Sequence, residues 1–245
     1  MKRWSESVVF SVLWLAWLGL LPGTFVALVV TGDGNWDRFW WVSSAVLAVA
    51  AWSNWFFRRR ERLGLALACI ALGMTFGMLA DVYGAFKVLR FTEPLVMIVP
   101  LFALGHVGYI AGLLLWARHL GLTGHPKWRK TLACIILVYC LMGLGLWATL
   151  VHPSDDLPAM HGPTAVYTLF LSVAAAVMAT VAWFDRRFLA VGIGGLLFLI
   201  SDGFLAVRLF QDNWSGLGDF CWITYGIGQM LIVYGAIGRS RAGGA

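Results

Sequence analysis

Two aspartates, Asp81 and Asp202, lie inside long apolar segments of the sequence. A carboxylate in the hydrocarbon region of a membrane costs about 3 kcal/mol on insertion scales, so both side chains must face a bundle interior or water. Two carboxyl groups in one cavity of low dielectric resist ionising together, and one can stay protonated while the other is charged. That division suits general acid and base catalysis. The alternative is that each carboxyl group only hydrogen-bonds a neighbouring helix.

Further polar residues lie near the aspartates and in the apolar segments that follow them. Four of these form two pairs, each on one helical face: His106 with Tyr109, and Tyr225 with Gln229. The pairs could line a cavity and hold water or a substrate oxygen, or they could only join helices. Ser201 precedes Asp202, but no base follows it at helical spacing, so a bond to its own helix is the alternative to a role in a site.

Residues of metal-binding type cluster in a polar stretch between two apolar segments: His152, Asp155, Asp156 and His161. Together with His106 they could supply the ligands of a zinc-dependent membrane amidase. Their spacing fits no recognised zinc site, and the four cysteines lack CxxC spacing. We therefore predict no metal and no cofactor, and a metal-dependent amidase is kept as an alternative.

Long apolar segments must position these residues. Hydrophobic residues make up 60% of the 245 residues and charged residues only 12%, which is far more apolar than a soluble domain. A span needs about 20 apolar residues, so about eight spans use most of the chain and predict one integral membrane domain over residues 1–245. The predicted fold class is an all-α polytopic bundle. Its spans cover approximately residues 8–30, 39–57, 63–86, 94–117, 131–151, 163–184, 188–210 and 218–238.

The basic residues are concentrated in every second connection between these spans. Fourteen of the 18 lie at the two ends of the chain and in the second, fourth and sixth connections, and the other four are Arg38, Lys87, Arg90 and Arg208. Because cytoplasmic loops carry an excess of Lys and Arg, this predicts a multi-pass protein of the cell membrane with both termini in the cytoplasm. The net charge of +6 thus reflects topology, and no nucleic acid partner is predicted.

The two halves of the chain are similar around the aspartates. Asp81 and Asp202 each precede a basic residue by six positions, and both predicted spans run outward. At about 1.5 Å per residue, the two carboxyl groups lie roughly 8 Å and roughly 12 Å below the outer ends of their spans, so they could share one cavity. A parallel repeat of four plus four helices would produce this arrangement.

Four segments, in this order and spacing, resemble the YhhN family of membrane lysoplasmalogenases. They are Phe76–Ala85 around Asp81, Phe102–Tyr109 around His106, Gly195–Ala206 around Asp202, and Tyr225–Ile232 around Gln229. The resemblance extends over roughly the third to the eighth span. It departs at Ser53-Asn54-Trp55, near which the family commonly has Lys-Pro.

The resemblance implies hydrolysis of the vinyl ether of a lysoplasmalogen to a fatty aldehyde and a glycerophospho-alcohol. It implies Asp81 and Asp202 as the acid and base pair, with pocket residues that orient water or substrate: His106, Tyr109, Ser201, Tyr225 and Gln229. The expected partner is a lipid substrate within the bilayer, with no protein partner and no cofactor. A different class of function is a proton- or cation-coupled transporter, in which the two aspartates bind the ion.

Overall fold

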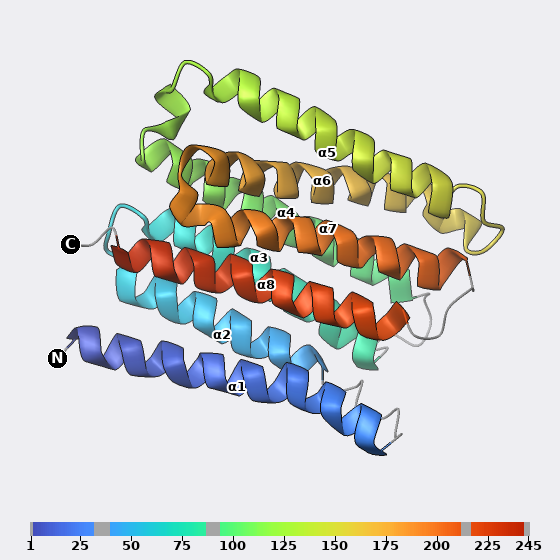
Figure 1. Ribbon diagram of the computed structural model, residues 1–245, viewed down its shortest axis with the longest axis horizontal. Coiled ribbons are helices and arrows are strands. Elements are labelled where there is room, and N and C mark those ends of the chain that lie inside the picture. The colour runs from blue at the N-terminus through green and yellow to red at the C-terminus, as the bar shows by residue number, and fades with distance from the viewer. Residues whose placement is uncertain (1, 32–39, 87–93, 212–216, 243–245) are drawn as a thin grey trace.

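A computed structural model describes residues 2–31, 40–86, 94–211 and 217–242 of the chain (Figure 1). Over these residues the fold is all-α, as predicted. Its long helices are α1 (Lys2–Thr31), α2 (Trp40–Arg58), α3 (Gly64–Phe86), α4 (Pro94–His119), α5 (Trp128–Leu150), α6 (His161–Phe184), α7 (Leu189–Phe210) and α8 (Leu217–Ala242). Short 3-10 helices lie in three of the described connections: η2 (Leu122–Gly124), η3 (Pro158–Met160) and η4 (Arg186–Phe188).

Among the described residues, seven of these eight helices are long and apolar enough to cross a membrane, so the chain is a multi-pass membrane protein. The eighth is α2, whose Ser43, Ser44 and Asn54 lower its hydropathy. These three side chains are only 2% exposed, so they face other helices rather than lipid. The prediction of about eight spans is thus confirmed for seven helices, and α2, whose polar face is buried in protein, does not reach the hydropathy of a span.

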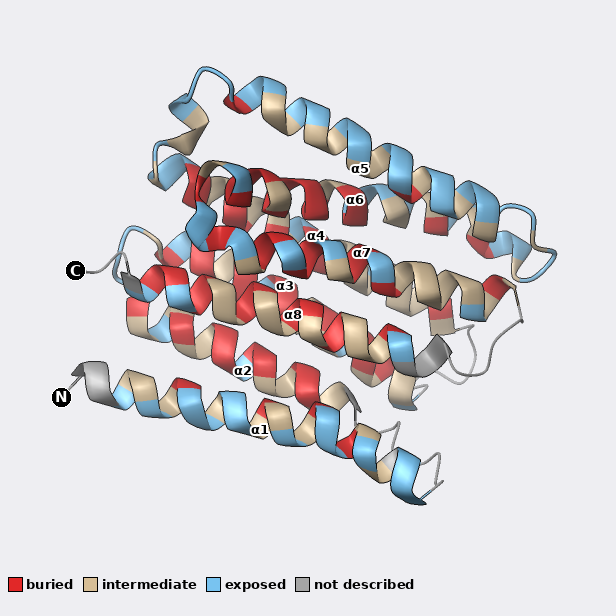
Figure 2. Cartoon of the chain, in the orientation of Figure 1, coloured by how far each residue is buried: buried red, intermediate tan, exposed pale blue. Residues whose placement is uncertain are grey.

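The helices are arranged as a ring with two outer helices. Contacts between neighbours join α2, α3, α4, α6, α7 and α8 in that order and close the ring between α8 and α2. Outside it, α1 packs on α2 and α8, whereas α5 packs on α6 and α7 (Figure 1). Buried residues are concentrated in the ring helices, while α1 and α5 are largely exposed along their length (Figure 2). Polar side chains that point into the ring are therefore shielded from lipid.

Glycines bring two helix pairs of the ring into close contact. A Cβ atom on Gly73 of α3 would lie 2.8 Å from the carbonyl oxygen of Gly105 on α4, and one on Gly194 of α7 would lie 2.7 Å from that of Gly228 on α8. Gly73 and Gly194 each precede an aspartate by eight residues. The same backbone contact therefore fixes the height and rotation of both aspartate-bearing helices. The four-plus-four repeat stays a prediction, which this paired contact supports.

Substitution of Gly194 by alanine should lower the stability of the bundle by about 1 to 3 kcal/mol, because the new methyl group would overlap a backbone carbonyl that cannot rotate away. Unfolding by SDS, followed by circular dichroism, measures this. The control is Gly145→Ala on α5, where a Cβ meets nothing within 4 Å. Equal stability of the two variants would contradict the close contact.

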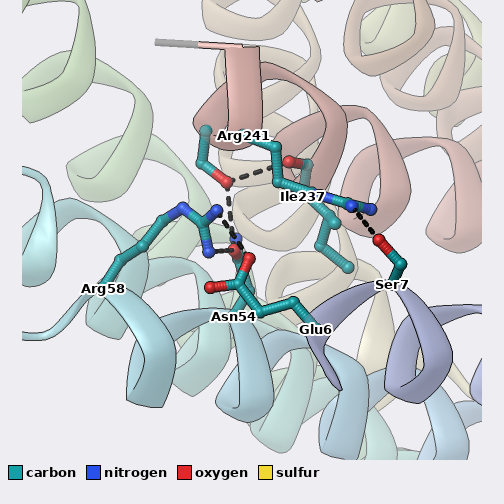
Figure 3. A network of polar contacts seen from close by, with 7 residues as sticks. Glu6, Ser7, Asn54, Arg58, Ile237 and Arg241 are labelled. Atoms are coloured by element: carbon teal, nitrogen blue, oxygen red, sulfur yellow. Dashed lines mark hydrogen bonds and ion pairs between the residues drawn. The ribbon is translucent and has the colours of Figure 1, made fainter. Parts of the chain in front are cut away.

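A buried polar network joins α1, α2 and α8 at the end of the bundle that holds both termini (Figure 3). Arg58 Nη2 forms an ion pair of 3.1 Å with Glu6 Oε2, and both side chains are largely buried. Arg58 Nη1 donates to Asn54 Oδ1 at 3.4 Å, and Ser240 Oγ donates to the same oxygen at 3.0 Å. The α1 helix extends beyond the predicted span of residues 8–30, and its additional first turns carry Glu6, the partner of Arg58.

Substitution of Glu6 by glutamine should destabilise the protein by about 3 kcal/mol, because it leaves the buried Arg58 guanidinium without a carboxylate. The matched control is Glu61→Gln, which neutralises an exposed glutamate in the connection between α2 and α3. Replacing both Glu6 and Arg58 by leucine should restore much of the loss. SDS unfolding of the four proteins checks this, and an unchanged midpoint for Glu6→Gln would show that the ion pair contributes nothing.

Candidate active site

Asp81 lies at the centre of three helices. Its carboxyl group is buried, with 6% of the residue exposed, and its Oδ2 accepts two short hydrogen bonds. Ser44 Oγ of α2 donates at 2.6 Å, and the Tyr225 hydroxyl of α8 donates at 2.7 Å. The two hydroxyl groups replace part of the water that the carboxyl group loses on burial in the bundle.

Tyr109 and Gln229 form a second contact across the ring, from α4 to α8. The Tyr109 hydroxyl donates to Gln229 Oε1 at 2.7 Å, and both side chains are fully enclosed. Gly77, one turn before Asp81, leaves room for this contact: a Cβ there would lie 3.3 Å from Gln229 Nε2 and 3.7 Å from the Tyr225 hydroxyl. Asp81, Tyr225, Gln229 and Tyr109 therefore form one continuous polar group.

Asp202 of α7 belongs to a separate polar group. The Tyr167 hydroxyl of α6 donates to Asp202 Oδ2 at 2.5 Å. Ser201 Oγ lies 3.4 Å from Asp202 Oδ1, but it donates a much shorter bond of 2.7 Å to the carbonyl oxygen of Phe198 in its own helix. Ser201 thus bonds mainly to its own backbone, which was the alternative to a direct role in the site.

His106 joins this second group from α4. Its Nε2 lies 3.4 Å from the Tyr167 hydroxyl, and its ring packs edge-on against Phe198 with centroids 5.0 Å apart. His106 is 2% exposed, and its Nδ1 has no hydrogen-bond partner among the described residues. The structure therefore separates His106 from Tyr109, which lies one turn away on the same helix but contacts α8.

A cavity of about 80 Å³ opens between α4, α5, α6 and α7. Its lining is mostly aliphatic and aromatic, and Asp202 and Tyr167 are among the few polar groups that reach it. Along α7 the cavity extends from Leu199 to Phe210, which is toward the end of the bundle opposite the termini (Figure 1). Asp81 is not among the described residues that line it. One aspartate thus faces a cavity while the other is enclosed.

Aromatic rings lie between the two carboxyl groups. The ring of Phe198 is 5.1 Å from that of Tyr225, which binds Asp81, and 5.0 Å from that of His106, which contacts the partner of Asp202. Among the described contacts, the two carboxyl groups share no hydrogen-bond partner. The aspartates therefore lie in two polar groups that an aromatic cluster connects.

Ser44 and Tyr167 hold the two carboxyl groups, and neither was predicted from the sequence. Both are polar residues within apolar helices, which by itself suggests a buried partner. Their separations from the aspartates are similar, at 37 residues for Ser44 and Asp81 and 35 for Tyr167 and Asp202. In each half of the chain, the partner lies on the helix that precedes the aspartate-bearing helix. This shared separation could have identified Ser44 and Tyr167 from the sequence.

The cluster between α5 and α6 forms no metal site in the part of the chain that the structure describes. There, no group of three or more His, Cys, Asp or Glu residues is placed to hold a metal ion. His161 Nε2 instead contacts the backbone carbonyl oxygen of Asp156 at 3.1 Å, and His106 lies elsewhere against Tyr167. Of the two basic residues six positions after the aspartates, Arg208 is exposed and Lys87 lies outside the described residues.

The comparison with known proteins agrees with the resemblance seen in the sequence. The search for individual relatives found no matching curated protein and no matching solved structure. The model of the YhhN family, which is associated with lysoplasmalogenase activity, matches residues 37–236. The match covers α2 through most of α8, and it therefore includes the helix that provides Ser44. With this match over most of its length, the chain belongs to the YhhN family.

Proposed function

We propose that this protein is an integral membrane hydrolase that cleaves the vinyl ether bond of lysoplasmalogen-like lipids, releasing a fatty aldehyde and a glycerophospho-alcohol. The observation that carries the proposal is the carboxyl group of Asp202, held by Tyr167 at an apolar cavity inside a membrane bundle. A vinyl ether lipid has an aliphatic chain that such a lining accepts, and a bond beside the chain that an acid cleaves.

The chemistry needs a proton donor and a nearby negative charge. Protonation of the alkene carbon produces an oxocarbenium ion, water adds to its cationic carbon, and the resulting hemiacetal collapses to aldehyde and alcohol. Asp202 reaches the cavity and supplies the proton. Asp81, with two hydroxyl donors on one oxygen, stays a carboxylate and stabilises the cation electrostatically.

The substrate approaches from the non-cytoplasmic side in this proposal. The cavity lies at the end of the bundle away from both termini, whereas the connections rich in Lys and Arg lie at the same end as the termini (Figure 1). The excess of basic residues supports a cytoplasmic location of that end. The outer leaflet then supplies the lipid, and both termini are cytoplasmic.

Purified protein in detergent tests this function against a transporter. Three lysophospholipids with the same head group and chain are supplied, which differ only in a vinyl ether, an alkyl ether or an ester link. We expect fatty aldehyde from the vinyl ether alone, without a gradient or sealed vesicles. Absence of aldehyde in detergent, with proton-coupled uptake in vesicles, would favour the transporter and contradict the hydrolase.

Substitution of Ala206 by phenylalanine should raise KM for the vinyl ether lipid about tenfold or more and change kcat much less. Ala206 lies one turn from Asp202 in the cavity lining, so a benzyl group there occupies space that the aliphatic chain needs. The control is Ala148→Phe, which places the same bulk on the exposed face of α5. If KM is the same in both variants, the chain binds elsewhere.

A further inference from the structure

The hydrogen bonds around Asp202 are donated in one direction, because the Tyr167 hydroxyl has only one proton to donate. Tyr167 has one hydroxyl proton and directs it to Asp202 Oδ2 at 2.5 Å. Its oxygen can therefore only accept from His106, whose Nε2 lies 3.4 Å away. A neutral imidazole carries one proton, so this contact assigns it to Nε2 and leaves Nδ1 as a bare acceptor.

Nδ1 of His106 is the unusual atom of this arrangement. It is buried and without a partner among the described residues, and a buried polar atom in that state loses free energy unless water or a ligand reaches it. His106 is fixed in this orientation by the edge of its ring on Phe198 and by Tyr167. His106 is not among the described residues that line the cavity, so the free lone pair of Nδ1 reaches the site through an intervening water molecule.

We infer that His106 and Tyr167 form a proton relay that returns to Asp202 the proton it gives to the substrate, an inference that rests on the proposed function. In the first step Asp202 protonates the alkene carbon and becomes a carboxylate. Water then forms a bond to the cationic carbon and loses a proton, through the intervening water molecule, to His106 Nδ1. The Nε2 proton moves to the Tyr167 oxygen, and the Tyr167 proton moves to Asp202 Oδ2.

The protons balance over the cycle. One proton enters the alkene carbon, one returns to Asp202, and the hydroxyl group of water stays on the substrate as the hemiacetal. Collapse of the hemiacetal moves its hydroxyl proton to the leaving oxygen. No charge is left on His106, because each member of the relay gives one proton and takes one. His106 ends the turnover with its proton on Nδ1, so it must return to the Nε2–H tautomer and the Tyr167 hydroxyl must turn back to Asp202 before the next turnover. The cavity that Asp202 faces is mostly apolar, so the relay replaces bulk water as its proton source.

Single and multiple turnovers of Tyr167→Phe test the relay. This variant keeps the ring and the Asp202 carboxyl group but removes the hydroxyl between them. We expect the first equivalent of aldehyde at close to the wild-type rate and later turnovers slowed about 10²-fold or more. The matched control is Tyr139→Phe, which removes a hydroxyl from the same aromatic cluster and should leave both phases unchanged. Equal slowing of both phases, or no slowing, would overturn the relay.

His106→Gln provides a second variant in case the first does not fold. Its amide occupies much of the same space but cannot pass a proton between two nitrogens. Because water loses its proton to Nδ1 before aldehyde forms, we expect the first turnover of His106→Gln to be slowed as well as the later ones, and we expect added imidazole to restore both in His106→Gly. A steady-state rate for His106→Gln equal to that of wild type would contradict the assignment.

A measurement without substrate separates this inference from the proposed function. In protein labelled with ¹⁵N-histidine, the signals of His106 are identified by their absence in His106→Gln. We expect a protonated Nε2 and a bare Nδ1 in wild type, and a mixture of tautomers in Tyr167→Phe. A protonated Nδ1 in wild type would overturn the relay. Absence of aldehyde from wild type with the expected tautomer would instead contradict the hydrolase and leave only the tautomer assignment standing.

Discussion

Asparagine in place of Asp202 should lower the steady-state rate of aldehyde release by about 10³-fold or more, the largest effect expected of any single substitution in this protein. An amide cannot supply the proton that the alkene carbon must receive. Asparagine can still accept the hydrogen bond from Tyr167 through its carbonyl oxygen, so the fold should be kept. The measurement is aldehyde released per enzyme in detergent at saturating lipid.

The control for Asp202→Asn is Asp155→Asn, which neutralises an exposed carboxylate between α5 and α6 and should not change turnover. SDS unfolding midpoints of both variants show whether the bundle is intact. If Asp202→Asn turns over vinyl ether lipid within about tenfold of wild type, Asp202 is not the acid.

The second large effect is expected at Asp81. Asparagine there should lower kcat about 10²-fold, with little change in KM, because it removes the negative charge that stabilises the oxocarbenium ion and not a group that touches the lipid. Ser44 and Tyr225 can still donate to the amide oxygen, so their positions are kept. Steady-state kinetics over a range of lipid concentrations separate the two parameters.

Ser44→Ala is the matched variant for Asp81. It removes one of the two hydrogen bonds to the same oxygen and leaves the charge in place, and we expect a loss of about tenfold. A loss at Ser44→Ala as large as at Asp81→Asn would mean that geometry and not charge determines the rate. A larger loss at Asp81→Asn than at Asp202→Asn would reverse the two assigned roles.

The helices of this fold were predictable because a membrane leaves few alternatives. About 20 apolar residues must cross the hydrocarbon, and an intramembrane carboxyl group must point inward, so eight helices and two interior aspartates follow from composition and spacing. The α2 helix was the weakest element, since its buried face carries Ser44 and Asn54 and its apolar signal is reduced. Its polar residues mark the site and the network of Figure 3.

Which helical face meets which was not predictable from one sequence. His106 and Tyr109 were expected to act together because they share a helical face, but one contacts α6 and the other α8. That separation depends on how closely α3 and α4 approach at Gly73 and Gly105, which sets the rotation of α4 in the ring. The spacing of residues in the sequence determines which side chains share a face of one helix. Packing between helices determines which other helix each of those side chains contacts.

The position of α5 outside the ring has a consequence for how specificity can change. It forms one wall of the cavity with Gly143, Leu146 and Trp147, yet most of its surface faces away from the protein. Both carboxyl groups and their partners lie on ring helices. Substitutions on the inner side of α5 can therefore change the shape of the cavity without moving the carboxyl group of Asp202. We expect specificity for the aliphatic chain to change through this helix while the catalytic residues stay the same.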